Sequence, residues 1–137
     1  MDEQFDVSNR SGIFDPSQMI HTFWSMASGI IAFDENTVPQ NADDVTSFPR
    51  LTYDVSNTIF DRPVTISASI WDYSRSWARV EEIKNRIVSL LKDGGYCLRT
   101  DTGALWFTPG SPFVQRVGDA NDMIRRILIN VDIEPLQ

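Results

Sequence analysis

The chain has 137 residues, a formal net charge of −7 and one cysteine. This length is typical of one domain, so we expect residues 1–137 to form a single domain with its own hydrophobic core. One cysteine excludes an internal disulfide framework, and the excess of acidic residues argues against a protein that holds nucleic acid by its phosphates. No run approaches the roughly 20 apolar residues of a membrane-spanning helix, so we expect no membrane partner.

The N-terminal part predicts a polar segment, a helix and a short strand. Residues 1–13 are polar, and we expect them to be a flexible N-terminal segment. A helix is predicted to begin at Asp15-Pro16, because Asp caps a helix start and Pro is tolerated at the first helical position. Gly29 is its expected end, and Ile30–Phe33 is a short strand candidate.

Residues 34–49 form the longest stretch without an apolar pattern and predict a long loop. The stretch contains two prolines and four acidic residues, Asp34, Glu35, Asp43 and Asp44. Loops of this length are often interaction segments or mobile arms, and both interpretations remain open. The spacing lacks the glycine and ligand pattern of a calcium loop, so we expect no metal here.

A hairpin and a long helix follow, and they are the clearest pattern in the chain. Residues 50–59 and 64–70 alternate between apolar and polar side chains, which predicts two strands joined by a tight turn with one buried face. The period then changes to three and four over 77–91, which predicts an amphipathic helix. Gly94 and Gly95 are available to end this helix in the left-handed conformation.

The C-terminal part predicts short strands and one long strand. Three short candidates are Tyr96–Arg99, Ala104–Thr108 and Phe113–Val117, and we expect the Pro109–Pro112 segment to break the last two apart. The closing strand, 123–134, alternates throughout. The complete order predicts an α+β fold, a mainly antiparallel sheet with two helices packed on one face.

No catalytic pattern is present. The sequence has no glycine-rich phosphate loop, no nucleophile elbow and no paired metal ligands, so we expect no catalytic, cofactor-binding or metal-binding residues and no enzyme activity. His21 is the sole histidine; we interpret it as a packed or surface residue, and Cys97 as a small buried hydrophobe. Trp71, Tyr73 and Trp106 favour core or subunit-interface packing over base stacking, because basic residues are sparse around them in sequence.

The hairpin and helix resemble a known family. Phe48-Pro-Arg-Leu-Thr-Tyr53, Val64-Thr-Ile-Ser-Ala-Ser-Ile-Trp-Asp72 and the helix over 74–91 are similar to the tail terminator or tail-completion proteins of long-tailed bacteriophages and prophages. These are also called minor capsid or head–tail joining proteins. The resemblance covers about residues 14–134 and consists of element order more than of invariant residues. The acidic loop has no matching motif in the family.

The resemblance implies a virion structural protein that caps the tail tube as a ring, often a hexamer, and joins it to the head. Its implied partners are copies of itself, the tail tube protein and the head connector or stopper protein. DNA would pass through the ring without specific binding, and the net charge of −7 is consistent with a non-adhesive channel. The implied location is the head–tail junction of the virion, after assembly in the bacterial host cytoplasm. Asp34, Glu35, Asp43 and Asp44 are the candidate residues for the lumen or a ring face.

Two alternatives remain at this point. The chain could be a different neck or head-completion protein, which gene order or a captured partner would distinguish. It could instead be a small ligand-binding domain or enzyme that uses the 100–115 loops and Trp106, which a deep pocket with convergent polar groups would favour.

Overall fold

The computed structural model describes residues 16–37, 47–54, 63–101 and 103–136. Within these ranges the chain forms one six-stranded sheet, two α-helices and one short 3-10 helix. In chain order the elements are α1 (Pro16–Ser28), β1 (Ala32–Asp34), η1 (Glu35–Thr37), β2 (Arg50–Tyr53), β3 (Val64–Tyr73), α2 (Ala78–Leu91), β4 (Tyr96–Thr100), β5 (Gly103–Val117) and β6 (Ile124–Leu136).

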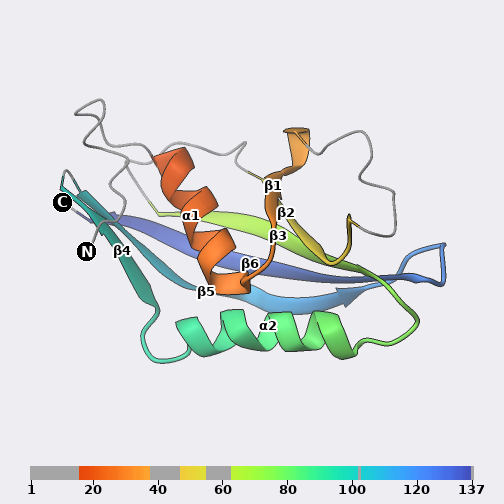
Figure 1. Cartoon of the computed structure of the whole chain (residues 1–137). Coiled ribbons are helices and arrows are strands. Elements are labelled where there is room, and N and C mark those ends of the chain that lie inside the picture. The colour runs from red at the N-terminus through yellow and green to blue at the C-terminus, as the bar shows by residue number, and fades with distance from the viewer. Residues whose placement is uncertain (1–15, 38–46, 55–62, 102, 137) are drawn as a thin grey trace.

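The sheet has the strand order β1-β2-β3-β6-β5-β4 (Figure 1). Every neighbouring pair is antiparallel except β1 and β2, which run parallel. The sheet curls, and both α-helices pack on the same face of it. The predicted α+β class, with a mainly antiparallel sheet and two helices on one face, is therefore confirmed.

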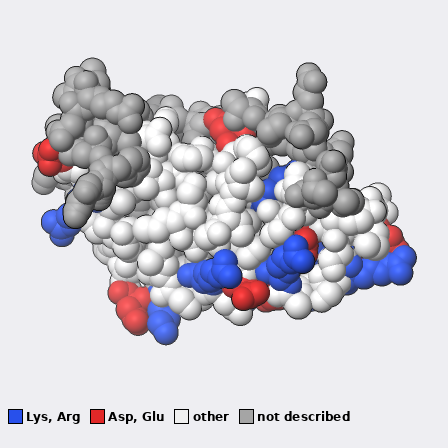
Figure 2. Space-filling model, viewed as in Figure 1, with Lys and Arg blue, Asp and Glu red and all other residues white. Residues whose placement is uncertain are grey.

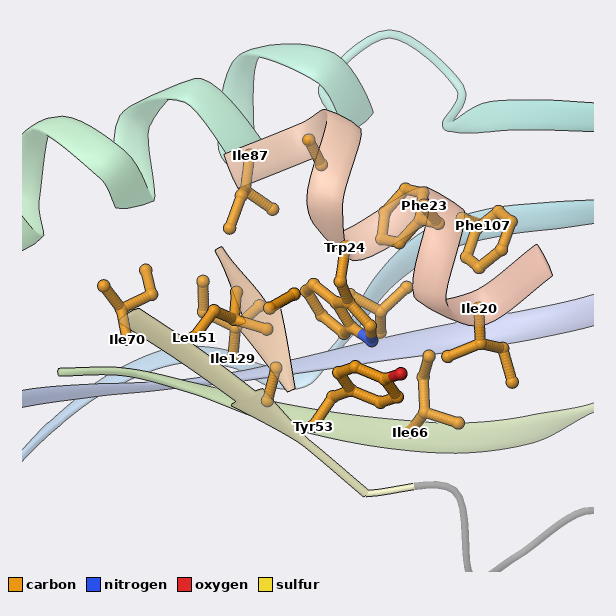
Figure 3. Close-up of a cluster of buried hydrophobic side chains, with 14 of the residues drawn as sticks. Ile20, Phe23, Trp24, Leu51, Tyr53, Ile66, Ile70, Ile87, Phe107 and Ile129 are labelled. Atoms are coloured by element: carbon orange, nitrogen blue, oxygen red, sulfur yellow. The ribbon is translucent and has the colours of Figure 1, made fainter. Parts of the chain in front are cut away.

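The hydrophobic core lies between this face and the two helices. Alternate residues of β3 and β6 face the helices, and the register places Ile66 opposite Val131 and Ala68 opposite Ile129. Figure 3 shows the side chains of α1 and α2 meeting those of the sheet. The fully buried large side chains include Met19, Ile20, Phe23, Trp24, Leu51, Ile70, Ile87, Leu91, Leu105, Phe107, Ile127 and Ile129.

The two predicted helices are found with boundaries close to those expected. Gly29 follows α1 with a φ of +72°, and its N–H donates to the Ser25 carbonyl oxygen at 3.0 Å, which closes the helix end. In α2 the buried residues are Val80, Ile83, Ile87 and Leu91, the stripe expected from the spacing. Gly94 and Gly95 both have positive φ after α2, as predicted.

The strand predictions are confirmed in part. β2 pairs with β3 in the predicted antiparallel arrangement, with Leu51 opposite Ile70 and Tyr53 opposite Ala68. The turn between them, and the predicted strand residues beyond Asp54, lie outside the described residues. The strand expected at 30–33 is β1, which begins two residues later and runs parallel to β2.

One prediction about the C-terminal strands is wrong. The Pro109–Pro112 segment does not separate two strands, because β5 runs unbroken from Gly103 to Val117. Its register against β6 shifts between Pro109 and Val114, and this irregularity accommodates prolines, which have no N–H to offer the ladder. Asn130 Nδ2 of β6 donates to the Pro112 carbonyl oxygen at 2.9 Å and holds the irregular part against the sheet.

Neither helix of the described residues combines the length and the hydropathy that crossing a lipid bilayer would require.

Candidate interaction surfaces

The acidic residues predicted as a site lie partly in ordered structure. Asp34 is the last residue of β1 and Glu35 the first of η1, so the first residues of the predicted 34–49 loop form regular structure. The Asn36 N–H donates to Asp34 Oδ1 at 3.0 Å, an Asx-type bond that stabilises the turn out of β1. Because Asp34 and Glu35 are neighbours in the chain, both lie at one corner of the sheet edge. Glu35 is exposed and Asp34 is half-buried. Asp43 and Asp44 lie outside the described residues.

A hollow of about 510 Å³ opens beside this corner, between α1 and the β1 edge. It is lined by Ser17, Gln18, His21, Ala32, Phe33, Asp34 and Tyr53. A hydrogen bond of 2.8 Å joins His21 Nδ1 to the Tyr53 hydroxyl. Burial, and then the negative charge of Asp34, raise the pKa of Tyr53, so the phenol stays protonated and able to donate. His21 is thus a partly buried residue with a structural partner, consistent with its interpretation from sequence.

The opposite edge of the sheet is β4, and its surroundings are more apolar. Cys97 of β4 lies opposite Trp106 of β5, whose indole is 37% exposed and donates from Nε1 to the Gly94 carbonyl oxygen at 2.8 Å. Leu136, also 37% exposed, ends the neighbouring β6. Cys97 was predicted to be buried, but it is only half-buried. Its side chain points to the face of the sheet that α1 and α2 do not cover.

The 100–115 region, which the ligand-binding alternative would use, carries a smaller hollow of about 250 Å³. Its lining is Cys97, Arg99, Thr100, Gly103, Ala104 and Leu136. Of these, only Arg99 is charged at neutral pH. In the part of the chain that the structure describes, no group of three or more His, Cys, Asp or Glu residues is placed to hold a metal ion.

The face of the sheet that neither described helix covers, here the helix-free face, carries polar side chains that bond across strands. Thr65 Oγ1 of β3 donates to Asp132 Oδ1 of β6 at 2.6 Å. One step along, Ser67 Oγ donates to Asn130 Oδ1 at 2.7 Å. These cross-strand pairs form polar rungs between β3 and β6 and fix the side chains that a contacting molecule would meet.

At one end of the helix-free face the topology assembles arginines and aromatic rings. The guanidinium of Arg126 lies 4.7 Å from the Trp71 ring centroid, and that of Arg50 lies 4.4 Å from the Phe48 ring centroid. Tyr73, 38% exposed, adjoins Phe48 with ring centroids 6.1 Å apart. Arginine and aromatic residues are the types enriched in protein interfaces.

Sequence reasoning missed this cluster. It found few basic residues near Trp71 because it considered chain neighbours only. Arg126 and Arg50 reach Trp71 through the register, since both are its direct cross-strand partners. The alternating pattern of the closing strand, in which Arg126 is one of the polar residues, was the one available clue.

The start of α2 is tied to the tip of the β5–β6 connection. The Ser74 N–H donates to the Met123 carbonyl oxygen at 2.6 Å, and Arg125 Nη2 donates to the Arg75 carbonyl oxygen at 2.8 Å. Arg116 donates to Glu81 Oε2 at 3.0 Å. Hydrogen bonds from Lys84 and then Arg116 lower the pKa of Glu81 despite an opposing desolvation effect. Figure 2 shows basic and acidic side chains interspersed along the side of the molecule that α2 forms.

Comparisons with known proteins give a likeness of fold. No family model and no curated protein matches the chain. Among solved structures, the chain is similar to one from the "Virion of native gene transfer agent (GTA) particle", with 12% sequence identity and a TM-score of 0.51. The alignment covers 83% of this chain and 84% of that chain. This protein therefore has a fold that also occurs in a chain of a virion particle.

Proposed function

We propose that this protein is a structural component of a long-tailed phage or prophage virion, the tail terminator at the head–tail junction. The observation that carries the proposal is the shared fold with a virion chain over 83% of this chain. The element order of the hairpin and α2 supports it, because the same order underlies the resemblance to tail-completion proteins. In this role the protein is not an enzyme and needs no cofactor.

In the proposed mechanism, copies of the chain form a ring, often a hexamer in the resembling family, that caps the last turn of the tail tube. One ring face would bind the tail tube protein and the other the head connector or stopper protein. Ring closure requires two different surfaces on each subunit. The sheet offers them, because β1 and β4 lie at its opposite edges. DNA would pass through the lumen without specific binding.

Deletion of the gene, followed by electron microscopy of the particles, tests the function. We expect tails of uncontrolled length, because nothing would end polymerisation of the tube, and we expect a wild-type copy supplied in trans to restore uniform tails. Normal tails detached from full heads would identify the protein as another neck or head-completion component. Particles indistinguishable from wild type would refute a role in the virion.

The acidic residues provide a second, more local test. Asp34→Asn with Glu35→Gln, and Asp43→Asn with Asp44→Asn, remove two charges each. If these residues face a partner at the lumen or a ring face, the four changes together are expected to reduce head–tail joining by about tenfold, which corresponds to roughly 1.4 kcal/mol of contact energy. Counts of joined and separate particles in electron micrographs measure this effect.

A matched control is available on the other side of the molecule. Glu82 and Asp93 are exposed residues in and just after α2. Glu82→Gln with Asp93→Asn removes the same charge as either acidic pair and is expected to leave joining unchanged. All variants should keep the far-UV circular dichroism of the wild type. Unchanged joining in the fourfold variant would remove these residues from the proposed site.

A further inference from the structure

One end of the helix-free face carries an arginine whose terminal nitrogens no described residue engages. Arg126 of β6 donates from Nε to Ser69 Oγ at 2.9 Å and lies over the Trp71 ring. Its two Nη atoms form no hydrogen bond or ion pair with the described residues. We propose that this guanidinium binds a carboxylate of a different virion protein, on an extended segment that lies along β3. The proposal rests on the proposed function and deepens it, because it assigns a partner-binding surface to named residues.

The arginines around the β5–β6 connection differ from Arg126, because carboxylates of the chain itself already neutralise them. Three such ion pairs, 3.0 to 3.7 Å long, are Arg75 with Asp122, Arg79 with Asp72 and Arg116 with Glu81. Asp119, in the same connection, accepts the Asn121 N–H with Oδ1 at 2.9 Å. No carboxylate of the described residues forms an ion pair with Arg126. Its positive charge is therefore available to a partner.

Three adjacent strands hold the Arg126 side chain in place before any partner binds. The Trp71 indole of β3 donates from Nε1 to Thr52 Oγ1 of β2 at 2.9 Å, which fixes the ring under the guanidinium. Because Ser69 occupies Nε, the two Nη atoms remain for a bidentate contact with a carboxylate. Arg126 is half-buried, so an ion pair here is screened less than one in open solvent. A side chain that is already ordered also loses little freedom on binding.

An exposed aromatic ring lies beside the guanidinium and adds an apolar contact. Tyr73 is two residues beyond Trp71 on β3 and therefore has the same orientation, and it is 38% exposed. Its ring adjoins that of Phe48, with centroids 6.1 Å apart. Two residues of a strand span roughly 7 Å, so an extended segment presents alternate side chains at the same interval. The expected partner segment carries Asp or Glu and, two positions away, an apolar residue.

A protein carboxylate fits this surface better than the phosphates of a nucleic acid. A phosphate backbone needs a row of cationic side chains. The helix-free face instead has carboxylates farther along β6, at Asp132 and at Glu134, which lies opposite Trp106. These charges would repel a polyanion that follows the face. One available guanidinium beside aromatic rings is a composition typical of a protein interface.

Photo-cross-linking in assembled particles tests the proposal. Tyr73 and, in a separate variant, Val117, the β5 strand partner of Arg126, are replaced by p-benzoylphenylalanine in a gene copy that complements the deletion. After irradiation we expect one or both variants to cross-link to a different virion protein, and mass spectrometry should map the site to a segment that contains Asp or Glu. A synthetic peptide of that segment then serves as the probe for binding to the purified full chain.

Calorimetric titration of this peptide tests the role of the guanidinium. Arg126→Gln, and replacement of the peptide's acidic residue by its amide, should each raise Kd about tenfold, and the two changes together should raise it little further. Arg126→Lys, which keeps the charge but not the fork, should lie between wild type and Arg126→Gln. Arg99→Gln is the matched control. Arg99 is an exposed arginine with the same orientation as Cys97, two residues earlier, and its loss should leave Kd unchanged.

The outcomes separate this inference from the function. Cross-links only to DNA or to copies of this chain, no cross-link from either position in assembled particles, or equal Kd values for wild type and Arg126→Gln would each overturn the proposal. Circular dichroism of each variant excludes unfolding as the cause. If the peptide binds through Arg126 but gene deletion leaves the tails normal, the docking surface stands and the terminator role falls. If deletion gives tails of uncontrolled length and no cross-link forms, only the docking surface falls.

Discussion

Replacing Phe107 by alanine is expected to lower the free energy of unfolding by about 3–5 kcal/mol. Phe107 is fully buried and stacks on Phe23 of α1, with ring centroids 3.9 Å apart and an interplanar angle of 3°. Its strand partner in β6 is Ile133, also fully buried. Truncation would leave a cavity between α1 and the sheet, lined by atoms that lose their contacts. Urea unfolding followed by far-UV circular dichroism measures the change.

Trp106→Ala is the control for this prediction, because it removes a larger side chain from the adjacent position. The indole is 37% exposed and makes one hydrogen bond, to the Gly94 carbonyl oxygen. We expect a loss of about 1–2 kcal/mol. Equal losses in the two variants would contradict the assignment of Phe107 to the core and of Trp106 to the surface.

Gly95→Ala is expected to lower the free energy of unfolding by about 3 kcal/mol. Gly95 has a φ of +88°, which costs an L-residue with a side chain about 1–2 kcal/mol. A Cβ there would also overlap the Phe107 carbonyl oxygen and lie 2.8 Å from Thr108 Cγ2. Overlap with the backbone of β5 cannot be relieved by a rotamer change, so it adds a further 1–3 kcal/mol or so. Thermal and urea unfolding give the value.

The neighbouring glycine separates these two costs. Gly94 has nearly the same φ, +86°, but a Cβ there would meet no atom within 4 Å. Gly94→Ala should therefore cost only the conformational part, about 1–2 kcal/mol. If Gly95→Ala proved no more destabilising than Gly94→Ala, that result would contradict the close packing of Gly95 against β5.

The elements that could be predicted from sequence are those whose periodicity follows directly from burial. α2 shows the three-and-four spacing because one stripe faces the sheet, and β6 alternates because one face is buried along its length. The fold class followed from these elements and their short connections. The parallel pairing of β1 with β2 could not be predicted, since a three-residue strand has too few side chains to show either a period or a partner.

The features that sequence reasoning missed depend on contacts between distant segments. Proline at 109 and 112 normally ends a strand, but the register shift against β6 supplies positions where no N–H is needed. Arg126 lies beside Trp71 only because β3 and β6 pair in one particular register. Among the proposed site residues, sequence identified Asp34 and Glu35 as acidic, but the turn that orders them depends on a contact made by Asn36.

The polar rungs of the helix-free face affect how β3 and β6 find their alignment. An alternating apolar stripe is insensitive to a slip of two residues, because such a slip returns the same face to the core. The rungs oppose such a slip in one direction: it would place Ser67 opposite Leu128 and Asp132 opposite Pro63, so that one hydroxyl and one carboxylate would lose their partners. Hydrophobic burial therefore determines which face turns inward, and the hydroxyl–carboxamide and hydroxyl–carboxylate pairs disfavour one of the two-residue slips that burial tolerates.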